Sequence, residues 1–205
     1  MPARDIVVVG GSAGGIEALV SLVAGLPVDL PCALFVVVHI TPHATSRLPE
    51  ILDRAGPLPV RHAEVGDAIV PGQIYVAPPD HHLLVHRNRV ELTRGPRENR
   101  SRPAIDPLFR SAARAYGPQV IGVVLSGALY DGAAGLLAIK SRGGLAIVQD
   151  PAGALIDSMP RSALRVVVAD EVLPAAAIGP AIARLALNGG EAPMPDQTDQ
   201  LTPVA

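Results

Sequence analysis

The sequence predicts an α/β fold of the doubly wound class, in which helices cover both faces of a mostly parallel sheet. Short apolar runs rich in β-branched residues recur along the chain, and stretches with helical periodicity separate them. The runs are apolar at every position rather than at every second one, which is typical of strands covered on both faces. We therefore predict strands at residues 6–9, 34–38, 120–125, 145–148 and 166–168.

Helical segments between these runs complete a βα alternation. Neighbouring parallel strands must be joined by a crossover, which is usually a helix. The first such segment begins at a glycine-rich turn directly after the first strand. Helices are predicted at residues 14–24, 46–54, 107–116, 132–141 and 175–187.

Residues 60–93 interrupt the alternation. Two short strand-like pieces, at 73–77 and 83–85, stand between turn-forming proline, glycine and asparagine residues. We interpret this region as a small antiparallel excursion with a hairpin that turns near Asn88. Residues 189–205 have no apolar period and are predicted to be a disordered tail, which leaves 1–188 as a single domain.

The composition excludes several classes of function. The chain has 205 residues, of which 49% are hydrophobic, and its single cysteine, Cys32, excludes a disulfide framework and a multi-cysteine zinc site. Aromatic residues make up only 2% and the net charge is −2, which argues against nucleic-acid binding. No apolar stretch reaches the roughly 18 residues of a membrane span, and no signal peptide is recognisable, so we expect a cytoplasmic protein without membrane insertion.

The strongest local signal is the segment GGSAGG at residues 10–15, between the first strand and the first helix. It fits G-x-S-x-G, the nucleophile elbow, in which small residues permit a tight turn that exposes the hydroxyl of the serine, here Ser12. The N-terminus of the helix directs free N–H groups, including that of Ala13, toward a developing oxyanion. A phosphate-binding loop would use the same N–H groups and is the alternative interpretation.

His39 is the candidate general base. A dinucleotide-binding loop would need a glycine where Ser12 stands, and its second strand would end in an acidic residue rather than in His39. Parallel strands lie about 4.8 Å apart, so side chains at the carboxyl ends of the first two strands can meet. A serine hydroxyl needs a neutral imidazole to accept its proton, and the imidazole needs an acid to fix its tautomer. For His39 taken alone, a hydrogen-bonded core histidine is the alternative.

Asp131 is the candidate acid. It follows the strand at 120–125 and stands at the start of the next predicted helix, so it reaches the same crevice if that strand lies on the other side of the first one. Aspartate is also a favoured helix N-cap, worth about 1 kcal/mol, and both roles stay open. No histidine follows Asp131, so the order along the chain is serine, histidine, aspartate, unlike the serine, acid, histidine order of α/β-hydrolases.

Three further histidines, His81, His82 and His86, fall within six residues. In a strand, His82 and His86 share one face but lie about 13 Å apart, too far for one metal ion. We expect solvated hairpin side chains there, and no metal or organic cofactor for the protein.

Several separate blocks make the chain resemble the catalytic domain of the chemotaxis methylesterase family CheB, from about residue 5 to residue 187. In that family the serine is the nucleophile, the histidine the base and the aspartate its orienting partner, and the resemblance implies these roles for Ser12, His39 and Asp131. The blocks are VGGSAGG (9–15), VVHITP (37–42), IYVAPPD (74–80), RPAIDPLF (102–109), LSG with DG (125–127 and 131–132) and QD with SMPR (149–150 and 158–161).

The chain departs from the family pattern in two ways. The family usually has Thr-Gly-Met-Gly before the catalytic aspartate, whereas this chain has SGAL at 126–129, which loses a methionine and a glycine. The family also commonly carries an N-terminal receiver domain, and here the catalytic domain begins almost at Met1, so control by an attached receiver is not expected.

The resemblance implies a serine hydrolase that demethylates glutamate 5-O-methyl esters on methyl-accepting chemoreceptor-like proteins, with deamidation of glutamines as a second reaction at the same site. The alternative is a non-catalytic CheB-like module that docks on chemosensory proteins, which only Ala128 and Leu129 favour. Six arginines at positions 87–102 could steer an acidic substrate, although a solvated loop is the default interpretation. The sequence leaves the oligomeric state open.

Overall fold

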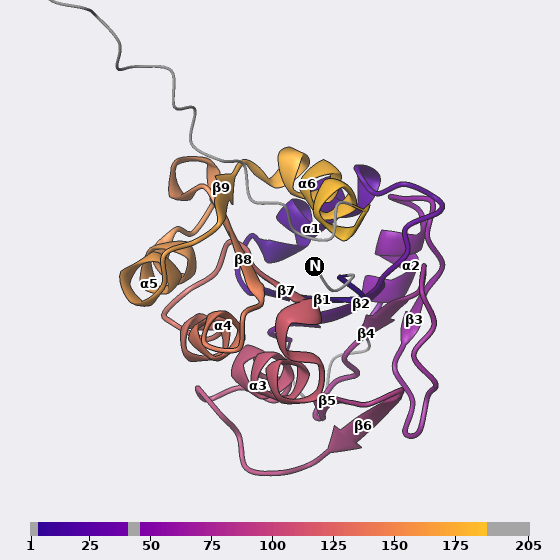
Figure 1. The fold of residues 1–205 in the computed structure, drawn as a ribbon. Helices are drawn as coiled ribbons and strands as arrows, with labels where there is room; N and C mark the ends of the chain where they lie inside the picture. The colour runs from indigo at the N-terminus through magenta and orange to yellow at the C-terminus, as the bar shows by residue number, and fades with distance from the viewer. Residues whose placement is uncertain (1–3, 41–45, 188–205) are drawn as a thin grey trace, which may run out of the picture.

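The computed structural model describes residues 4–40 and 46–187, and the predicted tail at 189–205 lies outside this part of the chain. Within the described residues the main sheet has seven strands, all parallel, in the order β3-β4-β2-β1-β7-β8-β9 (Figure 1). The strands are β1 (Ile6–Gly11), β2 (Ala33–Val38), β3 (Val60–His62), β4 (Ile74–Val76), β7 (Val120–Val124), β8 (Leu145–Gln149) and β9 (Glu171–Leu173).

Helices cover both faces of this sheet, as the doubly wound prediction requires (Figure 1). One face packs against α1, α2 and α6, and the other against α3, α4, α5 and a two-stranded hairpin of β5 (His82–His86) and β6 (Arg89–Thr93). The helices are α1 (Gly15–Ala24), α2 (Leu48–Asp53), α3 (Ile105–Tyr116), α4 (Ala133–Lys140), α5 (Ser158–Val166) and α6 (Ala175–Leu187), with short 3-10 turns at η1 (Gly117–Gln119) and η2 (Pro151–Gly153).

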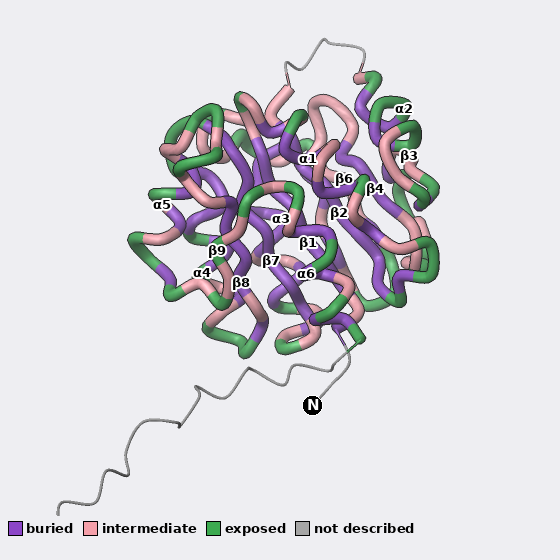
Figure 2. The backbone as a smooth tube through the Cα atoms, turned by 90° about the horizontal axis from the view of Figure 1, so that it is seen from above, coloured by how far each residue is buried: buried purple, intermediate pink, exposed green. Residues whose placement is uncertain are grey.

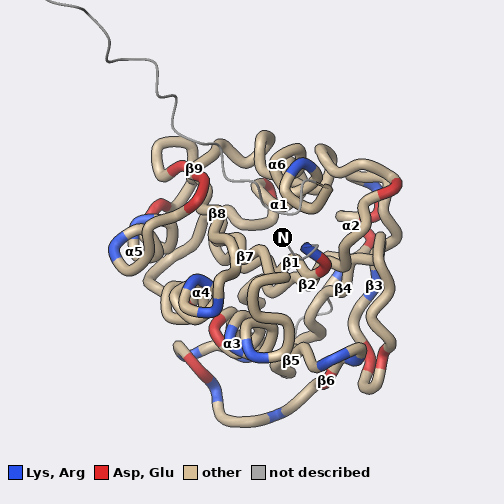
Figure 3. The backbone as a smooth tube through the Cα atoms, in the orientation of Figure 1, with Lys and Arg blue, Asp and Glu red and all other residues tan. Residues whose placement is uncertain are grey.

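Strand β1 shows why the predicted runs are apolar throughout. Successive side chains of a strand point to opposite faces, so Ile6 and Val8 enter one core while Val7 and Val9 enter the other. Strands β1, β2 and β7 are buried along their length (Figure 2), and they and β8 carry no charged residue (Figure 3). A run that alternated apolar and polar residues could not fill both cores.

The prediction of a strand at 166–168 is wrong. Val166 ends helix α5, Val168 lies outside any strand, and the edge strand of the sheet is β9 a few residues later. Met159, Ala163 and Val167 repeat every four residues and pack into one core, so the helical stripe outweighs the β-branched run. Helix α5 itself was not predicted.

The region 60–93 is only in part the antiparallel excursion that the sequence predicts. The hairpin is confirmed, since β5 and β6 pair antiparallel and Asn88 adopts φ 61° in the turn, a conformation that asparagine tolerates. The piece at 73–77, however, forms β4, which pairs in parallel with β2, and β3 adds a further parallel edge strand. The edge strand β3 has only three residues, too few to form an apolar run, which is why the pattern did not reveal it.

The sheet order places the candidate residues together. β1 is central, with β2 on one side and β7 on the other, so the carboxyl ends of all three strands meet at the switch point of the sheet. Ser12, His39 and Asp131 follow these three strands in turn. Among the helices described, none is long and apolar enough to cross a membrane.

Candidate active site

Ser12 stands immediately after β1, in a turn that the neighbouring strand loops hold. Its N–H donates to the carbonyl of Ser126 at 3.0 Å, and its own carbonyl accepts from the N–H of Gly15 at 2.8 Å, where α1 begins. These bonds fix the backbone of the serine between two strand ends. The hydroxyl group is thereby presented at the rim of the sheet, as a nucleophile elbow requires.

Two glycines make this turn possible. Gly14 adopts φ 74° at the N-cap of α1, a left-handed conformation that glycine enters without steric cost. Gly127 allows a close approach instead, because a Cβ atom there would lie 2.9 Å from the Cβ of Ser12 and 2.1 Å from the sulfur of Met159. Gly14, in the GGSAGG segment, and Gly127, in the LSG segment, are therefore both needed to bring Ser12 against the loop after β7.

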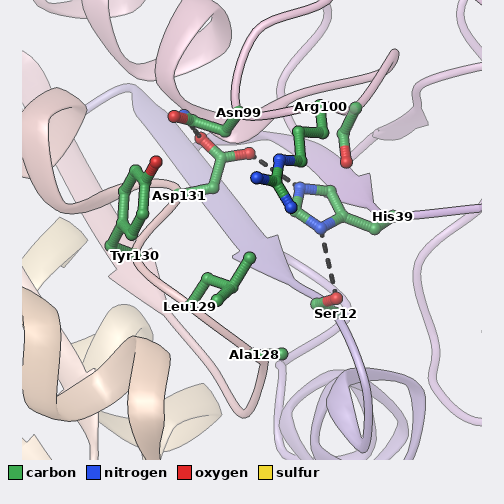
Figure 4. Close-up of a pocket in the computed structure, with 9 residues that line it drawn as sticks. Ser12, His39, Asn99, Arg100, Ala128, Leu129, Tyr130 and Asp131 are labelled. Carbon is green, nitrogen blue, oxygen red and sulfur yellow. Dashed lines mark hydrogen bonds and ion pairs between the residues drawn. The ribbon is translucent and has the colours of Figure 1, made fainter.

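His39 lies between the serine and the acid (Figure 4). Its Nδ1 is 3.1 Å from the hydroxyl oxygen of Ser12, and its Nε2 is 2.7 Å from Oδ2 of Asp131. An ionised carboxylate only accepts hydrogen bonds, so Nε2 carries the proton and donates it to Asp131. The lone pair of Nδ1 then faces the Ser12 hydroxyl, which is the arrangement that a general base needs.

The carboxylate of Asp131 is almost completely buried and lies against the N-terminus of α3. Besides His39, the backbone N–H groups of Ile105 and Asp106 donate to it at 2.8 and 3.1 Å. Burial alone would raise the pKa of Asp131, but the hydrogen bonds from His39 and from these two N–H groups outweigh it, and the pKa lies below its ordinary value. Asp131 thus stays ionised while it orients the imidazole.

The sequence left open a capping role for Asp131 at the helix that follows it, and the structure shows contacts with two helix ends. Asp131 accepts from the first N–H groups of α3 and, at 2.9 Å, from the N–H of Gly132 at the N-cap of α4. Oδ1 of Asp106 also accepts at the start of α4, from the N–H groups of Gly132 and Gly135 at 3.1 and 2.7 Å. Burial and the nearby charge of Asp131 raise the pKa of Asp106.

Asn99 joins the two carboxylates and was not singled out from the sequence. Its side-chain amide donates to Oδ1 of Asp131 at 2.6 Å (Figure 4). It also donates to Oδ2 of Asp106 at 3.0 Å. The residue adopts φ 49° in the loop between β6 and α3. No apolar pattern marks that loop, so no signal in a single sequence separates Asn99 from the other polar residues there.

A pocket of about 270 Å³ opens over the hydroxyl of Ser12. The guanidinium-bearing side chain of Arg100 reaches it from the same loop as Asn99, and the exposed side chains of Leu129 and Tyr130 line its other side (Figure 4). The pocket thus has an aliphatic and aromatic wall, the cation of Arg100 and the hydroxyl of Ser12.

The predicted oxyanion donor, Ala13, lies directly after Ser12 and is exposed. Its N–H has no hydrogen-bond acceptor among residues 4–40 and 46–187, which leaves it free to meet a ligand atom. We keep Ala13 as a prediction, since its donor role depends on a bound substrate.

One histidine of the hairpin, His82, does not lie where the sequence predicted it. His82 was expected to be solvated and is instead buried, with its Nε2 hydrogen-bonded to the carbonyl of Pro96 at 2.9 Å and its Nδ1 accepting from the N–H of Ala104 at 3.3 Å. It supports the backbone that leads into α3. In the described part of the chain, no group of three or more histidine, cysteine or acidic side chains is placed to hold a metal ion.

Serine, histidine and aspartate in this hydrogen-bonded order form the arrangement of Ser-His-Asp hydrolases. The family model of the CheB methylesterase matches residues 7–182, and the chain belongs to this family. The crystal structure of the CheB methylesterase catalytic domain of Thermotoga maritima superposes with a TM-score of 0.85 at 34% identity, and the match covers 90% of this chain and 100% of that one.

Curated relatives carry the name protein-glutamate methylesterase/protein-glutamine glutaminase. One from Anaeromyxobacter dehalogenans is 44% identical over 88% of this chain and 51% of its own length, and one from Methanosarcina mazei is 40% identical over 83% and 49%. The chain thus spans about half the length of these relatives. A putative member from Leptospira interrogans is 40% identical over 91% of this chain and 97% of its own length.

Proposed function

We propose that the protein is a serine hydrolase that removes methyl groups from glutamate 5-O-methyl esters on signalling proteins of the methyl-accepting chemoreceptor kind. The observation that carries this proposal is the continuous chain of hydrogen bonds from the Ser12 hydroxyl through His39 to the buried Asp131. The names of the relatives supply the substrate class. A cytoplasmic location and action on the cytoplasmic part of such receptors belong to the same proposal.

The reaction begins when Nδ1 of His39 accepts the proton of the Ser12 hydroxyl while its oxygen attacks the ester carbonyl. The carbonyl oxygen gains negative charge, which the N–H of Ala13 stabilises. Ionised Asp131 stabilises the imidazolium that forms and keeps the ring in place. His39 then returns the proton to the departing methoxy group, so that methanol leaves and an acyl-enzyme remains.

A water molecule completes the cycle. His39 accepts its proton as the oxygen attacks the acyl-enzyme, and Ser12 is released together with a glutamate carboxylate. A glutamine side chain would follow the same route with ammonia as the leaving group. Deamidation is therefore a second reaction proposed for the same site, and neither reaction requires a cofactor.

The arginines expected to steer an acidic substrate differ in their freedom. Arg102 is held by Oδ1 of Asp80 at 2.7 and 3.0 Å and by two backbone carbonyls, so it supports the loop. Arg97 and Arg100 are exposed, and Arg100 lines the pocket. We propose that these two attract the acidic surroundings of a methylated segment.

Methanol release from a methylated receptor fragment tests the proposed function. Ser12→Ala removes the nucleophile and should lower the rate on the order of 10³-fold or more, with thermal unfolding unchanged. His39→Ala should do the same. Ser21→Ala is the matched control, because its hydroxyl only bonds the carbonyl of Glu17 within α1.

Labelling with a serine-directed fluorophosphonate separates catalysis from mere binding. An activated Ser12 reacts with the probe, and the label is lost in Ser12→Ala but kept in Ser21→Ala. A folded protein that neither takes the label nor releases methanol would be a docking module instead. Retained methanol release in Ser12→Ala would remove the assigned nucleophile.

A further inference from the structure

A second cavity lies beside the catalytic pocket, at the surface of α4 and α5. It has a volume of about 520 Å³. Asn99 and Tyr130 line both cavities, so the two adjoin and Tyr130 forms part of the boundary between them. We call this cavity the α4–α5 groove and define it by Asn99, Tyr130, Ala133, Ala134, Leu137 and Val166.

Large apolar side chains in the groove face solvent. Tyr130 is 58% exposed, Leu137 44% and Val166 46%, whereas the neighbouring Leu136 is fully buried in the core below α4. Single exposed apolar residues are common on protein surfaces, but a set that lines one hollow next to a reactive centre marks a binding surface.

Several polar groups of the groove are already used within the protein. The Asn99 amide is bound to Asp131 and Asp106, and the hydroxyl of Ser162, which also lines the groove, donates to the carbonyl of Leu129 at 3.0 Å. Asp106 accepts from the N-terminus of α4. Apart from the cation of Arg165, the lining therefore offers a ligand mainly apolar contact.

We propose that the α4–α5 groove binds apolar side chains that flank the methylated glutamate in the substrate. This proposal rests on the function proposed above, because it assumes a polypeptide ester. The catalytic pocket, at about 270 Å³, accommodates one side chain and no more, so the rest of the segment must lie across the adjoining surface. The groove is the apolar hollow that shares its lining with that pocket, and an apolar neighbour of the ester is the group that gains most by entering it.

The test compares two peptides of equal length that carry one glutamate 5-methyl ester, flanked by leucines in the first and by serines in the second. Methanol release gives kcat/KM for each. The wild-type protein should prefer the leucine-flanked peptide roughly tenfold, as expected for apolar side chains that enter or miss an apolar site. This measurement uses only the wild-type protein, so it remains valid even if a substituted protein fails to fold.

Leu137→Asp and Val166→Asp place a charge in the groove and should reduce the preference to near unity. Val28→Asp is the matched control: Val28 is 75% exposed, but it precedes β2 and so lies at the opposite end of the sheet. This variant should keep the full preference. Size-exclusion chromatography of all four proteins shows whether a second copy of the chain occupies the groove instead.

Each outcome decides. Loss of the preference in the two groove variants and its retention in Val28→Asp support the proposal. Equal rates for both peptides in the wild-type protein, or a preference that persists in the groove variants, overturn the proposal. A wild-type dimer that dissociates only in the groove variants, with the peptide preference unchanged, also overturns it.

If the protein releases methanol from neither peptide, the proposed function itself is refuted. That result is distinct from equal release from both peptides, which refutes only the role of the groove.

Discussion

The buried side of the pocket over Ser12 and its exposed rim are built in different ways. On the buried side, Asp131 and Asp106 are each fixed by backbone N–H groups at the start of a helix, and Asn99 ties them together. At the rim, Ala128, Leu129 and Tyr130 face solvent. The rim could therefore change its side chains with little effect on the buried groups.

Two of the three positions where this chain departs from the family pattern lie at the rim. Ala128 and Leu129 replace the usual methionine and glycine there, whereas Ser126, in place of the usual threonine, is buried and keeps a hydroxyl group. If the rim sets substrate choice and the buried groups set reactivity, substitutions on the two sides should have different effects.

Asp131→Asn should have the largest effect of the changes to the buried side. An asparagine cannot hold His39 in the tautomer that leaves Nδ1 free to accept the Ser12 proton, so the rate of methanol release should fall about 10⁴-fold. Stopped assays of methanol release at pH 7 measure this. A loss below tenfold would show that the carboxylate does not orient the base.

The same substitution should change how stability depends on pH. The pKa of Asp131 lies below its ordinary value of 3.8 in the folded protein, so its ionised form stabilises the fold above that value, and this contribution is lost as the pH falls through the folded pKa. Urea unfolding should show a gap between wild type and Asp131→Asn that is widest near neutrality and narrows below about pH 4. Asp157→Asn, at an exposed carboxylate paired with Arg161, is the control with a small gap.

Asn99→Ala should have the next largest effect. It removes a neutral donor from a charged acceptor, a bond worth about 1.5–3 kcal/mol, so kcat should fall roughly 10- to 100-fold. Without this donor the His39–Asp131 pair binds a proton more readily, so the acid limb of the kcat/KM profile should move to higher pH. A positioning role predicts that shift, whereas simple loss of folded protein does not.

Asn88→Ala is the matched control for this change. Asn88 and Asn99 both adopt a left-handed backbone conformation, at φ 61° and 49°, so alanine carries the same steric penalty at either position. Only Asn99 contacts the carboxylates. If both variants lose activity equally and keep the wild-type pH profile, Asn99 serves only the loop.

These assignments also show how far the sequence could lead. Ser12, His39 and Asp131 each follow an apolar run, and parallel strands necessarily bring such positions to one edge, so their meeting was predictable. Asn99 lies in a loop without periodicity, and the contacts of Asp106 and Asp131 with both helix ends depend on how α3 and α4 pack. Edge strands β3 and β9 have three residues each, too few to produce a pattern.

Reversal of Arg97 and Arg100 to glutamate probes the rim. Long-range attraction of an acidic substrate should weaken, so kcat/KM should fall several-fold at low salt, and the difference should shrink as added salt screens the charges. The control reverses Arg54 and Arg142, two exposed arginines that do not line the pocket. If the two double variants have equal rates at every ionic strength, Arg97 and Arg100 do not steer the substrate.

Leu129→Gly should have the smallest effect, and its sign is informative. Leu129 adopts φ 69°, a conformation that costs a residue with a Cβ atom about 1–2 kcal/mol, whereas glycine enters it freely. The greater freedom of glycine in the unfolded chain opposes this gain by up to about 1 kcal/mol. The free energy of unfolding, measured in urea, should therefore rise by about 0.5–1 kcal/mol. Leu155→Gly, at an exposed leucine without positive φ, should instead destabilise the protein.

The activity of Leu129→Gly completes the comparison between the two sides of the site. If the strained leucine is kept for substrate contact, the stabilised variant should lose a few-fold in kcat/KM on a methylated peptide while the acid limb of its pH profile stays in place, because the buried carboxylates do not change. A variant that is both more stable and equally active would show that the rim tolerates strain without using it. A shifted pH profile would mean that the rim and the buried groups are coupled after all.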